Sequence, residues 1–525
     1  MIAPARKWIF GIALSTTVTV SGAAPPPDDW PMFGQNVSNT ASMTSPGNSM
    51  SPTTIGKLKP KWIFTTRGDV SARAAVVNGV VYFPDWGGNI WAVNANNGHL
   101  VWGHQLSDYG LAAGTVSRTS PAVVDGIVYI GTQYNTSGPT GWLLAINAGN
   151  GNLMWKTQPI TSNPFPVITG SPVVANGVVY VPMTSNEEFA AAQGSQNYNC
   201  CSVSGSVVAV NAATGAVIWS FNTVPAGYSG GGVWGSNPVL DPARNTVYVG
   251  TGNNYGVPTD AAYVVCINNG GTRATCQSPN NHADSIVALD MSTGALKWAK
   301  RLDTWDQPGV TDGSDFWNVD CFLTTTNCPT APGPDYDFGS APNEITYQTA
   351  NGPKTIIGAG QKSGIYYALD PDTGAELWHT QVGPGSSLGG MEWGSASDGI
   401  RIYVAISNFY GIPYRSGNAG SWASLDPAMG SILWQVADPN GAVDLGPLAV
   451  ADGVVYASSM AGSPTAQTMF ALDASSGKTL WGFAAGSSVN AGATIVQETV
   501  YWGSGYAHLG IPGYTGNNKF YAFSK

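Results

Sequence analysis

Several side chains in the middle of the chain have the chemistry that a binding site needs. Glu188 and Asp306 supply carboxylates and Asn253 supplies an amide oxygen, and hard divalent cations such as Ca²⁺ prefer these ligands. Trp234 follows three glycines, which leave room for a flat ligand to stack on its indole. Arg118 could offset the charge of an anionic group. These residues stand out because only 10% of the chain is charged.

The same residues also have purely structural explanations. Glu188 and Asp306 could be acids of polar surface loops, and Trp234 could be a core aromatic. Asn253 lies in a Gly-x-Gly-Asn-Asn run, which is also ordinary turn chemistry. The functional interpretation gains weight jointly, because the few acids and bases of this charge-poor chain fall at expected positions of separate repeats.

A repeat that extends along most of the chain must position these side chains. Its copies end in Ala-hydrophobic-Asn/Asp-x-x-x-Gly-x-hydrophobic-x-Trp, as in Ala92-Val93-Asn94 followed by Gly98 and Trp102. Asn-Gly and Asp-Gly pairs between β-branched runs predict tight hairpins, so each copy is a small antiparallel sheet of about four strands. The tryptophans of the copies are Trp62, Trp102, Trp155, Trp219, Trp298, Trp378, Trp434 and Trp481.

The repeat predicts an all-β, eight-bladed β-propeller. Seven copies are complete, and the eighth is divided between the two ends of the chain. Pairing a strand near residues 59–64 with one near 519–523 closes the ring and removes exposed sheet edges. We therefore expect a signal peptide over 1–24, a lead-in segment over 25–58 and one propeller over 59–525.

The composition and the first residues indicate export. Arg6 and Lys7 precede a short apolar stretch, and small residues at 21–24 offer a cleavage site. An uncleaved N-terminal anchor is the alternative, but no later segment has eighteen uninterrupted apolar residues, so no membrane span is expected in the mature chain. The net charge of −10 argues against nucleic acid as a partner. The predicted location is periplasmic or secreted.

Six cysteines, an even number, fit an oxidising compartment. They fall in close pairs, Cys200 with Cys201, Cys266 with Cys276, and Cys321 with Cys328. Separate bridges from Cys200 and Cys201 are the alternative to a bond between these neighbours. All six lie in the longest intervals between repeat tryptophans, where loops on one face of the ring would build a site.

The repeat resembles the tryptophan-docking repeat of PQQ-dependent (quinoprotein) alcohol dehydrogenases over roughly residues 60–525. Three runs sharpen the resemblance: one with Thr169, Ser185 and Glu188, one with Trp234 and Asn253, and the Trp-Asp pair at Asp306. In that family, residues at these places bind Ca²⁺ and pyrroloquinoline quinone (PQQ). Glu188 fits the family pattern better than its neighbour Glu187.

The resemblance implies a role for each residue. The implied Ca²⁺ ligands are Glu188, Asn253 and Asp306, and Asp306 is also the implied catalytic base. The implied PQQ-binding residues are Arg118, Thr169, Ser185, Cys200, Cys201, Trp234, Lys362 and Asn408. Trp86, Trp393 and the five histidines are interpreted as packing or loop residues.

The chain departs from the family pattern in two places. The Cys200–Cys201 pair follows Glu188, whereas the family places its adjacent cysteines one blade earlier, so contact of this pair with PQQ is in doubt. No Cys-x-x-Cys-His haem motif occurs in this sequence. We therefore expect electrons to pass to a separate acceptor, a soluble cytochrome c.

The opening run at residues 29–36 and the short loops most resemble polyvinyl-alcohol dehydrogenases, which oxidise secondary hydroxyls to ketones. A surface with few charges and many Tyr and Trp residues suits an uncharged alcohol or polyol. Two alternatives stay open. One is a quinoprotein for small alcohols or sugars, and the other is a noncatalytic propeller scaffold, like outer-membrane assembly lipoproteins with the same repeat.

Overall fold

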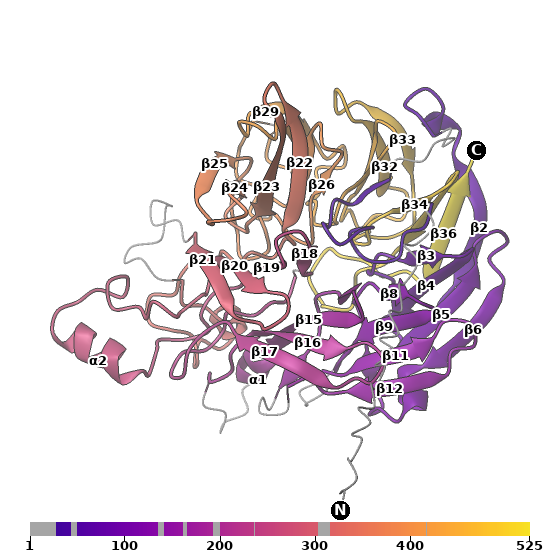
Figure 1. The fold of residues 1–525 in the computed structure, drawn as a ribbon. Helices are drawn as coiled ribbons and strands as arrows, with labels where there is room; N and C mark the ends of the chain where they lie inside the picture. The colour runs from indigo at the N-terminus through magenta and orange to yellow at the C-terminus, as the bar shows by residue number, and fades with distance from the viewer. Residues whose placement is uncertain are drawn as a thin grey trace, which may run out of the picture.

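The structure, a computed structural model, describes residues 28–43, 50–134, 141–160, 165–192, 200–235, 237–302, 315–415 and 417–525. The predicted signal peptide lies outside these residues. Figure 1 shows small twisted sheets around a common centre, with the chain passing from one sheet to the next around the ring. Eight sheets of four or five strands follow one another, which confirms the predicted eight-bladed propeller.

Each blade is an antiparallel sheet whose strands follow in chain order from the centre outward. Blades 1 to 4 contain β3 (Ala75–Val77), β4 (Val80–Asp85), β5 (Asn89–Asn94), β6 (Leu100–Gln105); β8 (Ala122–Val124), β9 (Ile127–Gly131), β11 (Leu143–Asn147), β12 (Leu153–Thr157); β14 (Val173–Ala175), β15 (Val178–Ser185), β16 (Ser206–Asn211), β17 (Val217–Asn222); and β18 (Val239–Asp241), β19 (Thr246–Gly250), β20 (Ser285–Asp290), β21 (Leu296–Arg301).

Blades 5 to 8 have the same order, with the last blade built from both ends of the chain. They contain β22 (Asn343–Thr349), β23 (Gly352–Gly360), β24 (Ile365–Leu369), β25 (Glu376–Gln381); β26 (Ala396–Ser397), β27 (Ile402–Ile406), β28 (Ser421–Leu425), β29 (Ile432–Ala437); β30 (Ala449–Ala451), β31 (Val454–Ser458), β32 (Met469–Asp473), β33 (Thr479–Phe483); and β34 (Thr494–Val496), β35 (Thr499–Gly503), β36 (Lys519–Ser524), β2 (Lys59–Thr65).

The ring closes as the sequence predicts. β2 pairs antiparallel with β36, with Trp62 opposite Ala522, and Figure 1 shows the yellow C-terminal strand beside the purple β2. Closure leaves each blade in contact with two neighbours and removes the open edges that invite aggregation.

A girdle of tryptophans joins neighbouring blades. The indole N–H of each repeat tryptophan donates to a main-chain carbonyl of the next blade at 2.8–3.2 Å. In chain order from Trp62, the acceptors are Ala95, Ala148, Ala212, Met291, Pro371, Pro427, Ala474 and Leu58. In seven of these junctions the repeat glycine of the next blade lies against the indole, where a Cβ would come within 3 Å of the ring. This contact explains why the repeat requires glycine before its tryptophan.

An N-terminal strap, residues 28–43, runs across the innermost strands. Its main chain bonds to those strands in six blades, through Val76, Val123, Leu240, Glu344, Ser397 and Val450. Ser42–Met43 forms β1, which pairs parallel with β30. Arg73 is buried and donates to the carbonyl of Phe33 in the strap at 2.8 Å and to Leu448 of blade 7 at 2.7 Å.

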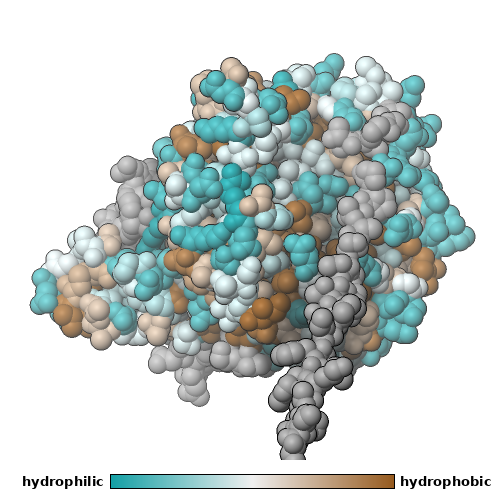
Figure 2. Space-filling view, viewed as in Figure 1, coloured by the Kyte–Doolittle hydropathy of each residue, from teal (hydrophilic) through white to brown (hydrophobic). Residues whose placement is uncertain are grey.

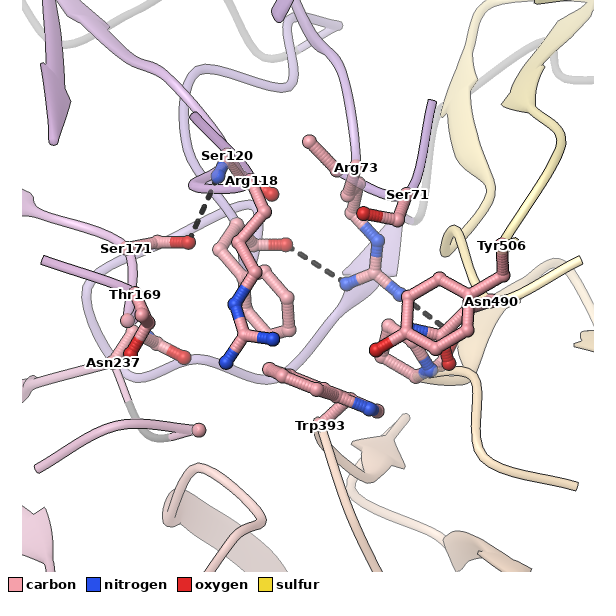
Figure 3. A pocket seen from close by; sticks show the side chains of 15 residues that line it. Ser71, Arg73, Arg118, Ser120, Thr169, Ser171, Asn237, Trp393, Asn490 and Tyr506 are labelled. Atoms are coloured by element: carbon pink, nitrogen blue, oxygen red, sulfur yellow. Dashed lines mark hydrogen bonds between the residues drawn. The ribbon is translucent and has the colours of Figure 1, made fainter. Parts of the chain in front are cut away.

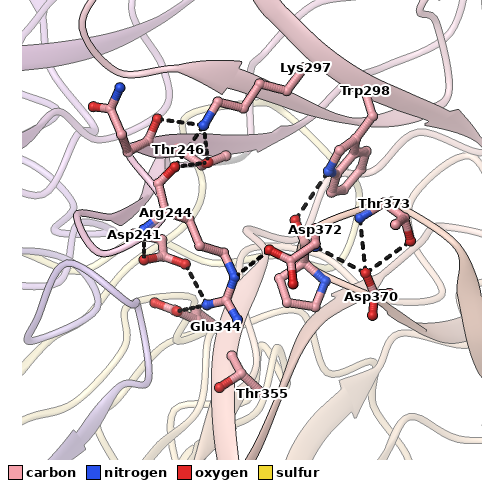
Figure 4. Close-up of polar contacts among 12 residues, drawn as sticks. Asp241, Arg244, Thr246, Lys297, Trp298, Glu344, Thr355, Asp370, Asp372 and Thr373 are labelled. Carbon is pink, nitrogen blue, oxygen red and sulfur yellow. Dashed lines mark hydrogen bonds and ion pairs between the residues drawn. The ribbon is translucent and has the colours of Figure 1, made fainter.

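Blades 4 and 5 are also joined by a network around Arg244 (Figure 4). Its guanidinium contacts Asp241 at 2.8 Å and Asp372 at 2.9 Å, and lies 3.8 Å from Glu344. Ser38 of the strap donates to Glu344 at 2.7 Å. The network therefore fixes the strap to the junction of blades 4 and 5, and the largest insertions lie within blade 4 and between these two blades.

The remaining elements are short and belong to connections. They are β7 (Thr115–Val116), β10 (Gln133–Tyr134) and β13 (Pro166–Val167), helices α1 (Glu187–Ala192) and α2 (Ala261–Asn268), and 3-10 helices η1 (Ile55–Lys57), η2 (Leu106–Tyr109) and η3 (Val319–Phe322). Within the described ranges, no helix has the length and apolar character needed to cross a membrane.

Candidate active site

The topology gathers most of the predicted site residues at one end of the ring. Arg118, Thr169 and Trp234 come just before the first strands of blades 2, 3 and 4. The start of the first strand and the end of the second strand lie at the same end of an antiparallel blade. Ser185 ends the second strand of its blade, and Lys362 follows a second strand shortly after its end. Residues far apart in sequence therefore share one face of the propeller.

Asp337, which the sequence analysis did not single out, connects three of the predicted residues. Its carboxylate accepts a hydrogen bond from the main-chain N–H of Asn253 at 2.6 Å and from the indole of Trp234 at 2.7 Å. It also accepts one from the ammonium of Lys362 at 3.2 Å. Asp337 is 5% exposed, so this charged network lies away from solvent.

Asp335 forms the second half of this network. Both of its carboxylate oxygens lie 3.0–3.1 Å from Nζ of Lys362. Burial raises the pKa of Asp335 well above its usual range, although Lys362 opposes the shift. Burial alone would lower the pKa of Lys362, but Asp335 and Asp337 together raise it. The Lys362 ammonium contacts both oxygens of Asp335 and favours the ionised carboxylate, so the pair places a group that can accept a proton inside the site.

The two neighbouring glutamates of α1 have different environments. Glu187 is fully buried and accepts hydrogen bonds from the main-chain N–H groups of Ser202 and Val203 at 2.6 and 2.9 Å. Glu188 is half-buried, and burial together with Asp337 raises its pKa to about 8. The carboxylate of Glu187 is thus engaged in folding the loop, whereas that of Glu188 faces the charged network.

The side-chain amide of Asn253 is oriented by two main-chain acceptors. Its Nδ2 donates to the carbonyl of Trp317 at 2.8 Å and to that of Asn254 at 3.1 Å. Among the described residues, none donates a hydrogen bond to its Oδ1, although the side chain is 1% exposed. An amide oxygen is one of the ligands that hard divalent cations accept. This oxygen is therefore suited to a cation.

Two tryptophans border the network at the centre of the ring. The Lys362 ammonium lies 5.0 Å from the ring of Trp234, and the Arg118 guanidinium lies 4.5 Å from the ring of Trp393. The two indoles meet edge to face at 5.4 Å. Trp393, interpreted from sequence as a packing or loop residue, therefore belongs to the site.

Figure 3 shows Arg118 and Trp393 lining a cavity at the centre of the ring, with Arg73, Thr169 and Tyr506 around it. Nε of Arg118 is buried and has no hydrogen-bond partner among the described residues. Burial lowers the pKa of Arg118, while Tyr506 and Glu392 oppose that shift. An anionic group of a ligand would satisfy this guanidinium.

The cysteines pair as close neighbours, with bonds Cys200–Cys201, Cys266–Cys276 and Cys321–Cys328. The alternative of separate bridges from Cys200 and Cys201 is therefore wrong. The Sγ of Cys200 lies 3.9 Å from Nδ2 of Asn318, and Asn318 also donates to the carbonyl of Tyr255 at 2.9 Å. The adjacent pair is thus connected to the loop that carries the acidic network.

Asn408 and Asp306 remain predictions. The amide of Asn408 donates to the carbonyls of Ile412 and Ala419 at 2.9 and 3.1 Å, and its Oδ1 accepts from the N–H of Ile412, so its own loop occupies it. Asp306 lies outside the described residues.

Thr169 donates to the carbonyl of Trp234 at 2.8 Å, and the hydroxyl oxygen of Ser185 accepts from the N–H of Glu187 at 2.9 Å.

A signal for the residues that the sequence analysis missed is present in the repeat. Trp234, Phe338 and Trp393 each precede a Gly-Ser pair at the entry of a first strand. Aligning the blades at this entry places Asp335 and Asp337 immediately before it in blade 5. The sequence interpretation assigned Trp393 to packing and took the base from a Trp-Asp pair. It therefore did not use this register.

The arrangement fits a quinone cofactor with a hard cation. The donors that face one another are carboxylate and amide oxygens, which suit Ca²⁺ or a similar ion. Carboxylates outnumber the cations Lys362 and Arg118 in this buried region, so a bound cation would reduce an unfavourable excess of negative charge. No group of three His, Cys, Asp or Glu side chains in the described ranges forms a complete metal-binding cluster. The amide of Asn253 would therefore be part of the ligand set.

Comparisons with known proteins identify the family of the chain. A family model described as "Outer membrane protein assembly factor BamB" matches residues 57–200 and 361–511. A polyvinylalcohol dehydrogenase of Pseudomonas sp. is 31% identical over 93% of this chain and 75% of its own length. A second one, from Sphingopyxis sp. (strain 113P3), is 31% identical over 86% of this chain and 69% of its own length.

Solved structures share the fold. The quinohemoprotein alcohol dehydrogenase of Comamonas testosteroni superposes with a TM-score of 0.69 at 18% identity, covering 95% of this chain and 80% of that one. A europium-containing methanol dehydrogenase gives the same TM-score at 16% identity, covering 95% of this chain and 98% of that one. With its eight-bladed ring and its two relatives at 31% identity, the chain belongs to the polyvinylalcohol dehydrogenase family of quinoprotein alcohol dehydrogenases.

Proposed function

We propose that this protein oxidises secondary hydroxyls of an uncharged polyol, polyvinyl alcohol or a similar chain, to ketones with PQQ and Ca²⁺. The observation that carries the proposal is the buried Asp335–Lys362–Asp337 network beside Glu188 and Asn253. The two polyvinylalcohol dehydrogenases at 31% identity support the substrate class.

Each residue of the network has a role in this proposal. Asp335, rather than Asp306, accepts the proton of the substrate hydroxyl, because it lies inside the site and the Lys362 ammonium favours its ionised form. Lys362 orients that carboxylate through two contacts near 3 Å. Glu188 and the Oδ1 of Asn253 hold the cation.

The remaining residues hold and surround the cofactor. Trp234 offers a flat face, and Arg118 pairs with a cofactor carboxylate. When bound, the quinone accepts the two electrons and two hydrogens that the alcohol loses on becoming a ketone, and the metal polarises a quinone carbonyl.

Reconstitution tests the activity directly. The purified chain is incubated with PQQ and either Ca²⁺ or a lanthanide, since a europium-containing relative of this fold exists. A dye-linked assay then compares polyvinyl alcohol, 2-propanol, ethanol and glucose. We expect turnover of polyvinyl alcohol and 2-propanol with Ca²⁺. Turnover of ethanol or glucose alone would overturn the substrate class, and activity with the lanthanide alone would overturn the choice of metal.

Two matched variants test the base. Asp335→Asn keeps the shape of the side chain and removes its basicity, so kcat should fall about 1000-fold. Asp306→Asn should change kcat less than about threefold if Asp335 is the base. The reverse ranking would return the role to Asp306.

The export of the protein and its electron acceptor also remain proposals. Three disulfides support an oxidising, extracytoplasmic location, which fractionation of the native host would test. We propose a separate cytochrome c as acceptor. Substrate-dependent reduction of soluble cytochrome c without dye would support it, and reduction of dye alone would contradict it.

A noncatalytic scaffold is the second candidate, because the matched family model is described as an assembly factor. The solved assembly factor BamB from Moraxella catarrhalis shares the fold with a TM-score of 0.53. A scaffold has no need of a buried lysine between two aspartates. Failure of the reconstituted protein to oxidise any alcohol would favour this candidate.

A further inference from the structure

Two disulfide-stapled insertions form one lobe beside the site. The first contains α2 and the Cys266–Cys276 bond, and the second contains η3 and the Cys321–Cys328 bond. Arg273 of the first donates to the carbonyls of residues 330 and 331 in the second, at 2.6 and 3.0 Å. Figure 1 shows α2 projecting away from the ring, and Figure 2 shows tan and brown hydrophobic residues at that end.

Three large apolar side chains stand exposed where this lobe meets α1. Phe189 is 50% exposed, Phe322 is 51% exposed and Leu323 is 63% exposed. Helix α1 lies beside η3, and Asn327 donates to the carbonyl of Ala191 at 3.1 Å. We call Phe189, Phe322 and Leu323 the apolar rim. Exposure of three large apolar side chains in one region has an energetic cost that a ligand would relieve.

The apolar rim is directly connected to the proposed metal ligands. Phe189 follows Glu188 in the same helix. The ring of Phe322 packs edge to face on Trp317 at 5.1 Å, and the carbonyl of Trp317 accepts from the amide of Asn253. A molecule lying on the rim would therefore be one or two side chains away from the cation site.

The rim carries no charge of its own. Residues 321–334 contain no Asp, Glu, Lys or Arg. Asp320, next to this segment, is fully buried and accepts hydrogen bonds from Asn327 N–H and the Thr324 hydroxyl, both at 2.7 Å. Glu188, which precedes Phe189, is half-buried and belongs to the site. The exposed residues at 322–326 are instead Phe, Leu and three threonines. The exposed part of this segment thus combines apolar and hydroxyl groups and contains no charge that would attract a charged partner.

We propose that the apolar rim docks a segment of an uncharged polyol chain while a neighbouring hydroxyl of the same chain occupies the active site. Such a chain alternates methylene and hydroxyl-bearing carbons, which match the apolar and threonine side chains of the rim. This inference rests on the proposed function and adds a second binding region, outside the site, that a small alcohol is too short to reach.

The test compares a polymer with a small substrate in the reconstituted holoenzyme. The double variant Phe322→Ser/Leu323→Ser should raise KM for polyvinyl alcohol about tenfold, since two half-exposed apolar contacts are lost. Its kcat and its KM for 2-propanol should stay within about twofold of the wild-type values. Phe189→Ser, on the other element of the rim, should raise only the polymer KM, about threefold.

A matched control and a second assay separate the outcomes. Met429→Ser removes a side chain that is 71% exposed in the turn between β28 and β29, at the opposite end of the blade, and should change no parameter. Normal 2-propanol oxidation with an unchanged polymer KM would overturn the rim and leave the proposed function intact. The rim would also be overturned if the double variant impaired only reduction of cytochrome c, since the surface would then serve a protein acceptor. Absence of turnover on any alcohol by the wild-type protein would instead defeat the proposed function.

Discussion

The tryptophan girdle and the candidate active site at the axis of the ring (the axial site) are each built from a position that recurs in every blade. The girdle keeps the same residue at its position, whereas the axial site has different residues at its own. At the girdle, each junction repeats one contact, an indole N–H on a neighbouring carbonyl. At the entry of the first strands, blades 2, 3, 4 and 6 instead present Arg118, Thr169, Trp234 and Trp393. Repetition therefore builds the ring, and departures from the repeat supply the chemistry.

The two regions also differ in the kind of interaction that they contain. Each girdle contact is neutral, and its acceptor is a main-chain carbonyl. The geometry of the hydrogen bond therefore does not depend on the side chain at the acceptor residue. The axial network places Asp335, Asp337 and Lys362 together away from water. Removal of one partner from a buried charge network leaves the others uncompensated. We therefore expect substitutions at the axis to damage function and those at the girdle to damage stability.

The largest expected effect on cofactor binding follows from Asp337→Asn. The variant keeps the shape of the side chain but removes the charge that Lys362 and the indole of Trp234 contact. Loss of a buried charge partner costs about 3 kcal/mol, which corresponds to an about 150-fold loss in a binding constant. Titration of PQQ in the presence of Ca²⁺ measures this loss. Unchanged PQQ affinity would show that Asp337 only supports the fold.

The girdle should respond through stability. Gly374 has a φ of +70°, and a Cβ there would lie 2.5 Å from the indole of Trp298. Gly374→Ala should lower the free energy of unfolding by about 3 kcal/mol through strain and overpacking. Gly177 has a similar φ of +74° with open space around it, so Gly177→Ala should cost only about 1 kcal/mol.

Denaturant unfolding of both variants measures the difference that the indole contact makes. The kcat of the folded fraction should stay unchanged in each. Equal losses of stability in the two variants would show that backbone strain alone, and not the tryptophan contact, explains the repeat glycine.

A smaller effect is expected from pH on metal binding. Burial raises the pKa of Glu188 to about 8 in the metal-free protein, so this carboxyl is mostly protonated at pH 7 and must release its proton to bind a cation. Ca²⁺ affinity should therefore rise about tenfold per pH unit between pH 6 and 8, and level off above 8. Calorimetry in buffers of different ionisation enthalpy measures the released proton. In Glu188→Gln the slope should disappear.

The same group affects the stability of the metal-free protein. Since the folded pKa lies above the unfolded value of 4.5, the folded state holds more protons between these values. The contribution of Glu188 to stability is present at low pH and is lost as pH rises toward about 8. Saturation with Ca²⁺ should remove this dependence, and a dependence that Ca²⁺ leaves unchanged would place the cation elsewhere.

The smallest effect is expected at Tyr506, which lies near Arg118 and opposes the lowering of the Arg118 pKa. Tyr506→Phe should weaken PQQ binding about fivefold, because one neutral partner of the guanidinium is lost. Fluorescence quenching of the site tryptophans by PQQ measures the change, and Tyr514→Phe serves as a neighbouring control. Equal affinity in the Tyr506→Phe variant would show that Arg118 is held by the cation–π contact with Trp393 alone.

The sequence predicted the ring and much of the site neighbourhood, but not the contacts within it. The docking tryptophans form a periodic local signal, and the structure confirms both their register and the pairing of the terminal strands. Asp335 and Asp337 had no comparable signal, because a carboxylate in a loop has no periodicity. Their proximity to Lys362 depends on how an insertion of blade 4 folds back toward blade 5.

The amino-acid sequence by itself determined the number of blades, the closure of the ring and the end of the propeller where polar loops gather, since these follow from strand alternation and repeat spacing. Only the tertiary structure decided which acids meet. It directed Glu187 into its own loop and left Glu188 facing the site, and it placed Lys362 between two aspartates. Local patterns fix the strands, whereas contacts between loops of different blades depend on burial and charge in three dimensions.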